Sequence, residues 1–433
     1  MDRKPAPTVS LSLMMLLQYA VWGIWLPYLA SYLQASTGEG GLGFTSSQVG
    51  WILGLAGSIG AVSAPFLGGQ IADRFMNAER WLAILLIIGG ILKFITASVH
   101  DYSTFLTLSI LYSVFYMPTL ALTNSIAFAH LRNSERDFPI VRTWGTLGWI
   151  IASNAFPLIH LQQNVHFSPL PPFFVGEPIA NSKALIADAL RVSGVMAVLY
   201  GVWAMFFLPK TPPTRSVEHP LAFLRAFKLL SHPGFLIVTL AALPIAMIHQ
   251  VFFIRTSVFL NSFLKFEDQY VGPIMSISQF SEIFFLAILG LFLKRLGYRA
   301  VLAIGCLAFA ARYALFAIST EQTREIAIAA CVLHGICYGF FFAGSFLYVE
   351  RVAPPDSRHS AQTVFGIIIL GLGPVLAGIY NQWLDKAFPT AGTNPAWKGL
   401  WLVQAAIGLT CAIFVALAFR PGLPKTTPQP AAA

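Results

Sequence analysis

The sequence contains very little charge for its length. Only 10% of its 433 residues are Asp, Glu, Lys or Arg, whereas 56% are hydrophobic. A soluble globular protein carries about 25% charged residues, so this chain lacks the means to cover a surface that faces water all round. The composition predicts a polytopic membrane protein, with the lipid bilayer in contact with most of its surface.

Cysteine is also scarce, and motifs for catalysis or metal binding are missing. The four cysteines all lie inside apolar runs, which indicates small packing residues rather than disulfides or a metal site. No HExxH sequence, nucleophile elbow or phosphate-binding loop occurs. We therefore expect no enzyme activity, no cofactor and no metal. The net charge of +9 is spread over short clusters between apolar runs, as topology signals are, which argues against a nucleic-acid partner.

Twelve apolar runs are long enough to cross roughly 30 Å of hydrocarbon. Their approximate limits are 9–34, 46–73, 80–99, 103–131, 138–161, 185–209, 234–264, 270–293, 299–318, 324–352, 359–384 and 399–420. They predict an all-α fold of twelve transmembrane helices. A basic, Pro-rich stretch follows the sixth run, so we expect three parts: a six-helix bundle (1–209), a cytoplasmic linker (210–233) and a second six-helix bundle (234–433).

Positive charge predicts the orientation of the chain. An even number of spans puts both termini on one side of the membrane. Loops on that side hold seventeen Lys and Arg residues, and the opposite loops hold five. Because basic loops stay in the cytoplasm, both termini are expected to be cytoplasmic.

The two halves of the chain share a loop pattern. The loop after the second run reads GGQIADRFMNAER, and the loop after the eighth reads LGLFLKRLGYR. The first contains Gly69, Asp73 and Arg74, similar to the Gly-x-x-x-Asp-Arg signature of the major facilitator superfamily, where the Asp caps a helix end or pairs with a neighbouring Arg. A duplicated set of six helices is typical of secondary transporters, whose two bundles rock about a central site.

Polar side chains within the runs predict that site. Charged groups at membrane depth usually face a cavity or pair with one another. Helical spacing gathers cation, acid, amide and aromatic groups on single faces of four runs: Arg142, Thr146 and Trp149; His249, Gln250 and Phe253; Met275, Gln279 and Glu282; His334 and Tyr338. A solute with a flat heteroaromatic ring and a polyol would use them all.

Structural interpretations of the same residues stay open. Polar transmembrane residues such as Thr146 can serve only to hold helices together, and Arg142 and Glu282 can simply neutralise each other. Lys93 and Arg255 could extend towards a membrane interface, and Arg312 is interpreted as structural.

Several segments resemble a known family. They are MPTLALTNSIAF (117–128), FPIVRTWGTLGW (138–149), IMSISQFSEIFF (274–285), ARYALFA (311–317) and GSFLYVE (344–350). These are similar to bacterial nucleoside permeases of the nucleoside:proton symporter family, within the major facilitator superfamily, and the similarity runs from about Leu13 to Arg420. The resemblance implies the major facilitator fold and import of nucleosides with protons by alternating access across a bacterial inner membrane. We expect a monomer.

The resemblance also implies where the substrate binds. The family's contacts carry over onto Arg142, Thr146, Gln250, Gln279 and Glu282. Departures from the permease pattern surround them: Trp149 replaces Phe, Phe253 replaces Asn, His334 replaces Tyr and Tyr338 replaces Phe.

One departure concerns proton coupling directly. Gly339 stands where the permease has an Asp on which transport depends. Burial and a nearby Arg can tune a carboxylate, and histidine titrates near neutral pH, so Glu282 and His334 are the candidate proton acceptors. Two alternatives remain: an uncoupled nucleoside facilitator, or a carrier of another polar solute such as a sugar or nucleobase. The long loop at 162–185 could either cover the external entrance or act as a passive connection.

Overall fold

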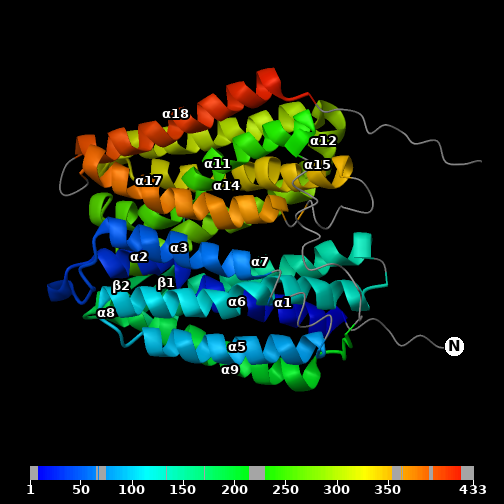
Figure 1. Ribbon diagram of the computed structural model, residues 1–433. Helices are drawn as coiled ribbons and strands as arrows, with labels where there is room; N and C mark the ends of the chain where they lie inside the picture. The colour runs from blue at the N-terminus through cyan, green and yellow to red at the C-terminus, as the bar shows by residue number, and fades with distance from the viewer. Residues whose placement is uncertain are drawn as a thin grey trace, which may run out of the picture.

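The computed structural model describes residues 8–64, 67, 75–132, 134–169, 171–213, 230–353, 362, 364–389 and 394–420. The described chain is mainly helical, and its helices gather into two groups that lie one above the other in Figure 1. The start of α1 and the end of α18 lie at the same end of the molecule (Figure 1).

The first group contains the helices that precede the predicted linker. They are α1 (Thr8–Gly23), α2 (Leu26–Gln34), α3 (Ser46–Ala64), α5 (Ala78–Thr96), α6 (Tyr102–His130), α7 (Ser134–His160), α8 (Ser182–Leu185) and α9 (Ala187–Phe207). Most of the predicted linker, 210–233, lies outside the described residues.

The second group contains the helices that follow the linker, and three of them include π-helical stretches. Its elements are α11 (Pro233–Val258) with η4 (Phe259–Phe263), α12 (Asp268–Ile318), α13 (Glu325–Val332), α14 (His334–Ile336), η6 (Cys337–Ala343), α15 (Gly344–Val352), η7 (Ile367–Leu372), α17 (Gly373–Ala387) and α18 (Asn394–Ala418).

The described helices account for twelve membrane spans. Nine stretches of the described chain are long and apolar enough to cross a bilayer. One of them, α12, has 51 residues and a kink at Gly297, so it supplies two spans and raises the number to ten. Helices α5 and α7 have 19 and 27 residues but more polar or charged side chains, and they complete the twelve.

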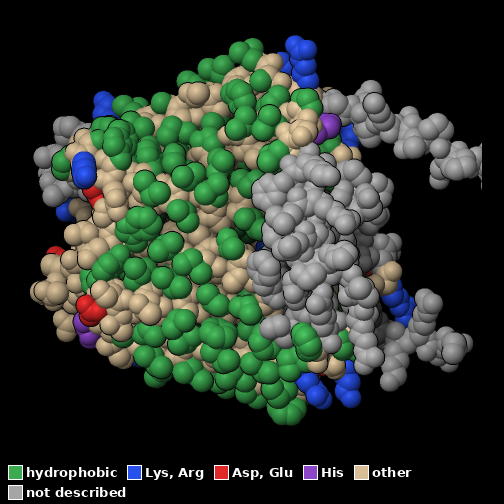
Figure 2. Space-filling view, in the orientation of Figure 1, with side chains coloured by type: hydrophobic (Ala, Val, Ile, Leu, Met, Phe, Trp, Pro, Cys, Tyr) green, Lys and Arg blue, Asp and Glu red, His purple; other side chains and the backbone are tan. Residues whose placement is uncertain are grey.

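The surface of the molecule matches a membrane environment. Figure 2 shows hydrophobic side chains across the middle of the visible face, whereas the coloured Lys and Arg side chains lie towards its two ends. Many apolar side chains of the described chain are highly exposed, among them Ile159, Phe206 and Leu417. Exposed apolar side chains of this kind are stable in lipid, because the hydrocarbon in contact with them is as apolar as they are.

Two of the membrane spans contain a break in their helical geometry. The first span breaks between Gly23 and Leu26, which separates α1 from α2. In α12, Gly297 has φ 74° and ψ 169°, a backbone conformation that residues with a Cβ rarely adopt. The eighth and ninth spans are therefore joined at a single residue rather than by a loop.

The predicted helical fold is accompanied by one short β-hairpin. The loop after α7 forms an antiparallel hairpin of β1 (Gln162–Phe167) and β2 (Phe174–Pro178) at the end of the molecule remote from the termini (Figure 1). This hairpin contacts the second group, because Tyr270 on α12 donates through its hydroxyl to the Gly176 carbonyl at 2.9 Å and accepts from the Gly176 amide at 3.2 Å. It is thus more than a passive connection.

Further contacts join the two groups at this same end. Lys183 on α8 forms an ion pair with Asp268 at the start of α12 and also donates to Asn261 at 3.1 Å. Asn381 on α17 donates to the carbonyl of Ser46 on α3 at 2.7 Å. The groups are therefore closed against each other at the end remote from the termini.

Two cations whose place the sequence left open, Lys93 and Arg255, are buried in protein rather than extended to an interface. The side chain of Arg255 is completely buried, donates from Nε to Asn381 at 2.7 Å and pairs with Asp385 at 2.6 Å. Lys93 is only 3% exposed and lies beneath the rings of Trp25 and Tyr112. Both cations face protein because their helices present other, apolar residues to the lipid.

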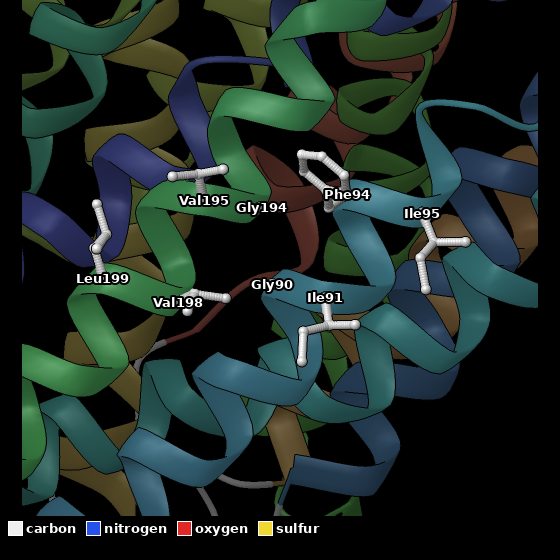
Figure 3. Close-up of a pocket in the computed structure, with 8 residues that line it drawn as sticks. All are labelled: Gly90, Ile91, Phe94, Ile95, Gly194, Val195, Val198 and Leu199. Carbon is white, nitrogen blue, oxygen red and sulfur yellow. The ribbon is translucent and has the colours of Figure 1, made fainter.

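A pair of glycines sets how closely α5 and α9 approach. A Cβ on Gly90 of α5 would come 2.6 Å from the carbonyl oxygen of Gly194 on α9, and the reverse substitution would meet the same limit. The crossing leaves an apolar groove of about 240 Å³ between the two helices. Figure 3 shows Ile91, Phe94 and Ile95 on its α5 side, with Val195, Val198 and Leu199 opposite. Small residues allow such close contacts in membrane helices.

Candidate functional site

Arg142 on α7 supplies the cationic part of the candidate site. Its guanidinium carbon lies 4.1 Å from the centre of the Tyr19 ring on α1, and the side chain is partly exposed. A Cβ on Gly145 would lie 2.6 Å from Tyr19 and 2.8 Å from Arg142. Glycine at 145 therefore makes room for the cation to stack on the ring.

Glu282 on α12 supplies the acid from the other group of helices. It is partly exposed and interacts electrostatically with Arg142. Tyr338 on η6 interacts with both of them and with Tyr19. None of the ion pairs found among the described residues joins Arg142 to Glu282. The two groups are thus within electrostatic range across the bundles without neutralising each other by direct contact.

The predicted amides lie on two helices of the second group, α11 and α12, and α12 also carries Glu282. Gln250 on α11 is partly exposed and donates from Nε2 to the carbonyl of Leu53 on α3 at 3.1 Å. Gln279 is partly exposed and lies three residues before Glu282, on the same face of α12. Thr146 is partly exposed one turn after Arg142. These positions agree with the helical spacing in the sequence.

The predicted aromatic residues differ in their surroundings. Trp149 is only 8% exposed and packs edge-to-face on Trp22, with ring centres 5.5 Å apart. Phe253 is partly exposed and packs edge-to-face against His249, with ring centres 5.4 Å apart. Phe253 is therefore more accessible to a solute than Trp149, whose ring supports α1.

His334 lies in a buried cluster behind Tyr338. Its Nδ1 atom is 2.6 Å from Nη1 of Arg312, and Nη2 of Arg312 donates to the Tyr313 hydroxyl at 3.0 Å. Because a guanidinium can only donate, Nδ1 of His334 must accept this bond and carries no proton. The His334 ring is stacked with that of Tyr338 at 6.4 Å and lies 5.4 Å from that of His249. Arg312 therefore links His334 to Tyr313 within this buried cluster.

The tenth span changes its helical geometry at the candidate site. Tyr338 and Gly339 lie in the π-helical stretch η6, which follows α14. Single π turns are found frequently at functional positions, because the extra residue per turn redirects side chains. A Cβ on Gly339 would meet Phe285 and Leu286 at an ordinary 3.7 Å, one turn after Glu282. The position where the permease has an Asp therefore faces the helix that carries Glu282.

Several residues of the predicted or observed site need separate mention. Gly69, Asp73 and Arg74 of the predicted gating loop lie outside the described residues. Tyr19 was not among the predicted residues, although its spacing from Trp22 in the first run is helical. Asn154 was also missed: it donates to Ser276 at 2.9 Å and joins α7 to α12.

No metal site is found in the part of the chain that the structure describes. No group of three His, Cys, Asp or Glu side chains there could hold an ion. The four cysteines are buried and free.

The fold and the site define a class of protein. Two six-helix groups with polar side chains meeting between them form the architecture of a secondary carrier of the major facilitator type. Comparison with protein families identifies this carrier further: residues 6–423 match the family model described as nucleoside H⁺ symporter, and the chain belongs to that family.

Individual relatives agree with this assignment. The chain is 32% identical to the putative nucleoside transporter YegT of Escherichia coli K12, covering 95% of this chain and 94% of the relative. It is 29% identical to the xanthosine permease of the same organism, covering 95% of each. The crystal structure of a mutant of the nucleoside transporter NupG matches with a TM-score of 0.82 and 27% identity, covering 95% of this chain and 100% of that one. The major facilitator fold expected from the sequence is thereby confirmed.

Proposed function

We propose that this symporter binds its nucleoside between Arg142 of the first bundle and Glu282 of the second. The observation that supports this is the electrostatic interaction of a guanidinium and a carboxylate from opposite bundles, with no direct ion pair between them among the described residues. A solute with several hydroxyl groups can bridge them. Because the contacts come from both bundles, binding draws the bundles together and favours alternating access.

The remaining groups have distinct roles in this proposal. Glu282 and Arg142 bind the ribose hydroxyls, since charged groups form the stronger hydrogen bonds. The amides of Gln250 and Gln279 bond to the base edge, with Thr146 beside them. Phe253 and Tyr338 offer partly exposed rings on which a base can stack. Trp149 and His334 support these groups from behind.

Glu282 is the proton acceptor in this proposal. A carboxylate that also binds substrate links proton uptake to solute binding, which symport requires. His334 is less suited, because its Nδ1 lone pair is occupied by Arg312. A proton there would place an imidazolium beside a guanidinium.

The arrangement in the membrane follows from the charge distribution. We propose that bundles 1–209 and 234–433 rock about the site, joined by the linker 210–233, in a monomer. Both termini face the cytoplasm of a bacterium with the protein in its inner membrane. The contacts of Lys183, Asp268 and the β1–β2 hairpin would then close the outer end.

Transport by purified protein in proteoliposomes tests the proposal. An inward proton gradient should drive uphill accumulation of labelled uridine or adenosine, and a protonophore should abolish it. Glu282→Gln and Arg142→Ala should each abolish transport while the protein remains folded in the membrane. Normal uptake by both variants would mean that the nucleoside binds elsewhere.

The glycine at 339 favours one alternative, an uncoupled facilitator. The protein would then only equilibrate nucleoside, with no response to the protonophore. Gly339→Asp gives a matched test because a Cβ at this position would meet nothing closer than 3.7 Å. If Glu282 carries the proton, the parent protein concentrates nucleoside without this substitution; if it does not, concentration should require Gly339→Asp. Competition by nucleosides, bases and sugars separates nucleoside from other polar solutes.

A further inference from the structure

A buried lysine in the first bundle lies outside the proposed nucleoside site. The Nζ atom of Lys93 is 3.7 Å from the ring centre of Trp25 and 3.7 Å from that of Tyr112. The two rings are nearly perpendicular, with centres 6.1 Å apart. Lys93 thus lies between the break in the first span and α6. Apolar side chains alone can pack such a contact between helices, so packing does not explain a cation at this position.

The direction of the side chain excludes contact with the membrane surface. Ile91 and Ile95 line the lipid-side groove between α5 and α9 (Figure 3) and are 50% and 47% exposed. Lys93 is two residues from each of them, which is about 200° around the helix axis. The ammonium therefore points into the bundle, away from lipid headgroups and from water at the interface.

No anion neutralises Lys93 among the described residues. Glu79 lies at the other end of α5 and accepts from the Thr211 amide. On α9, Asp188 is held by His160 and Arg191. Asp101 at the start of α6 is exposed and accepts from the Thr104 amide. The remaining titratable groups on the elements around Lys93 are Arg80 on α5 itself, Tyr102, Tyr116 and His130 on α6, Arg191 and Tyr200 on α9, and Tyr19, Tyr28 and Tyr32 on α1 and α2. Of all these groups, Tyr112 is the one in contact with the ammonium.

The second bundle contains a corresponding arrangement with an important difference. Arg312, also on the third span of its bundle, lies 4.5 Å from the ring centre of Phe252 on α11 and bonds to His334 on α14. In both bundles, therefore, a buried cation on the third span contacts rings from the first and fourth spans. Arginine stays charged at all working pH values, whereas lysine can lose its proton when it is buried.

The rings around Lys93 are connected to the nucleoside site. Tyr112 stacks on Tyr116 at 5.2 Å, and Tyr116 contacts Trp22 at 6.2 Å. Trp22 packs on Trp149. Trp25 lies three residues after Trp22, at the break between α1 and α2. A change in the contacts of Trp25 is therefore transmitted along the first span towards Tyr19 and Arg142.

We propose that Lys93 is a second protonation site of the transport cycle and that its charge positions the break at Trp25. The attraction to the two rings exists only for the ammonium form. Loss of the proton from Lys93 removes this attraction. Because the two equilibria are linked, separation of the rings in turn changes the affinity of Lys93 for the proton. The proton passes between Lys93 and water that enters when the rings separate. This inference concerns the coupling of the symporter and not the place where nucleoside binds.

The tryptophan emission of purified protein in lipid nanodiscs, without nucleoside, tests this directly. A titration from pH 5 to 10 should show a transition in the parent protein that disappears in Lys93→Met and in Lys93→Arg. Lys93→Arg retains a buried cation and thus separates loss of titration from loss of structure. Trp25→Phe, which keeps the lysine but removes the reporter, should lose most of the amplitude among the ten tryptophans.

A transport assay supplies the second measurement. Lys93→Arg should keep nucleoside counterflow, which needs no net proton movement, and change the pH dependence of gradient-driven uptake, to which Glu282 still contributes. The proposal is overturned if the parent shows no emission transition, if the transition persists in both lysine variants, or if Lys93→Arg has the parental pH profile. The emission titration uses no nucleoside, so a negative result there does not bear on the proposed substrate site. Conversely, if the protein takes up no nucleoside, the emission titration still tests Lys93.

Discussion

Gln250 on α11 donates a hydrogen bond to the backbone carbonyl of Leu53 on α3, so an amide proposed to bind substrate also joins the two bundles. The Nε2 atom of Gln250 carries two hydrogens, so one can bond to Leu53 while the other bonds to a base edge. A base bound at Gln250 would therefore share an amide that already links α11 to α3.

Replacing this amide should lower the apparent affinity for nucleoside. A neutral hydrogen bond contributes about 0.5–1.5 kcal/mol, so Gln250→Met should raise the KM of uptake up to about tenfold. Gln404→Met is the matched control, because Gln404 is buried on α18 and donates to the Leu400 carbonyl of its own helix. An unchanged KM for Gln250→Met would remove Gln250 from the substrate site.

Two neighbouring glycines should respond differently to alanine. A Cβ on Gly335 would lie 2.3 Å from the Ser281 hydroxyl and 2.4 Å from its backbone, whereas a Cβ on Gly339 meets nothing closer than 3.7 Å. Overpacking costs about 1–3 kcal/mol, so Gly335→Ala should lower the Tm by several degrees. Gly339→Ala should leave the Tm near that of the parent. Equal thermal stability of the two variants in the same detergent would contradict this packing.

Breaking the ion pair of Lys183 and Asp268 should open the end remote from the termini. Both side chains are largely buried, at 12% and 9% exposure, and removing one partner of a buried pair costs a few kcal/mol. Asp268→Asn should therefore increase, by about tenfold or more, the rate at which a membrane-impermeant thiol reagent labels Gln279→Cys from outside.

The control for this measurement is an acid whose ion pairs stay within one bundle. Asp188→Asn breaks contacts with His160 and Arg191 in the first bundle alone. Its labelling rate should match that of the parent. Equal rates for Asp268→Asn and Asp188→Asn would show that the ion pair between bundles does not restrict access.

His334 should prove dispensable for the pH dependence of transport. Its Nδ1 atom accepts from Arg312, so the ring stays neutral in the described conformation. His334→Gln retains an acceptor for Arg312, and its uptake should keep the parental response to the proton gradient. Glu282→Gln should show no uptake in the same experiment, with or without the gradient. Loss of the response in His334→Gln would instead identify His334 as a proton carrier.

Hydropathy and residue spacing predicted the number of spans and the faces on which Arg142, Gln279 and Glu282 lie. These properties depend on the length and period of single helices, which are local in sequence. The family resemblance added the fold, which the comparisons confirm. The residue roles stay predictions until the variants are measured.

The contacts between helices could not be derived in the same way. Trp149 shares a helical face with Arg142, yet its ring packs on Trp22 because α1 and α7 approach closely. The place of Lys93 stayed open, since the sequence gives its depth but not the rings that cover it. The β1–β2 hairpin is similarly hidden, because its pairing depends on two short, mostly exposed segments.

The positive φ of Gly297 has a mechanical consequence for the carrier. The part of α12 before Gly297 carries Glu282, and the part after it carries Arg312. No loop separates the two parts, so a change in the angle between them is taken up by the torsion angles of Gly297. Any side chain at 297 would resist that rotation, and the hinge would stiffen even though nothing touches it. The speed of the conformational cycle can therefore depend on a position remote from both the cargo and the protons.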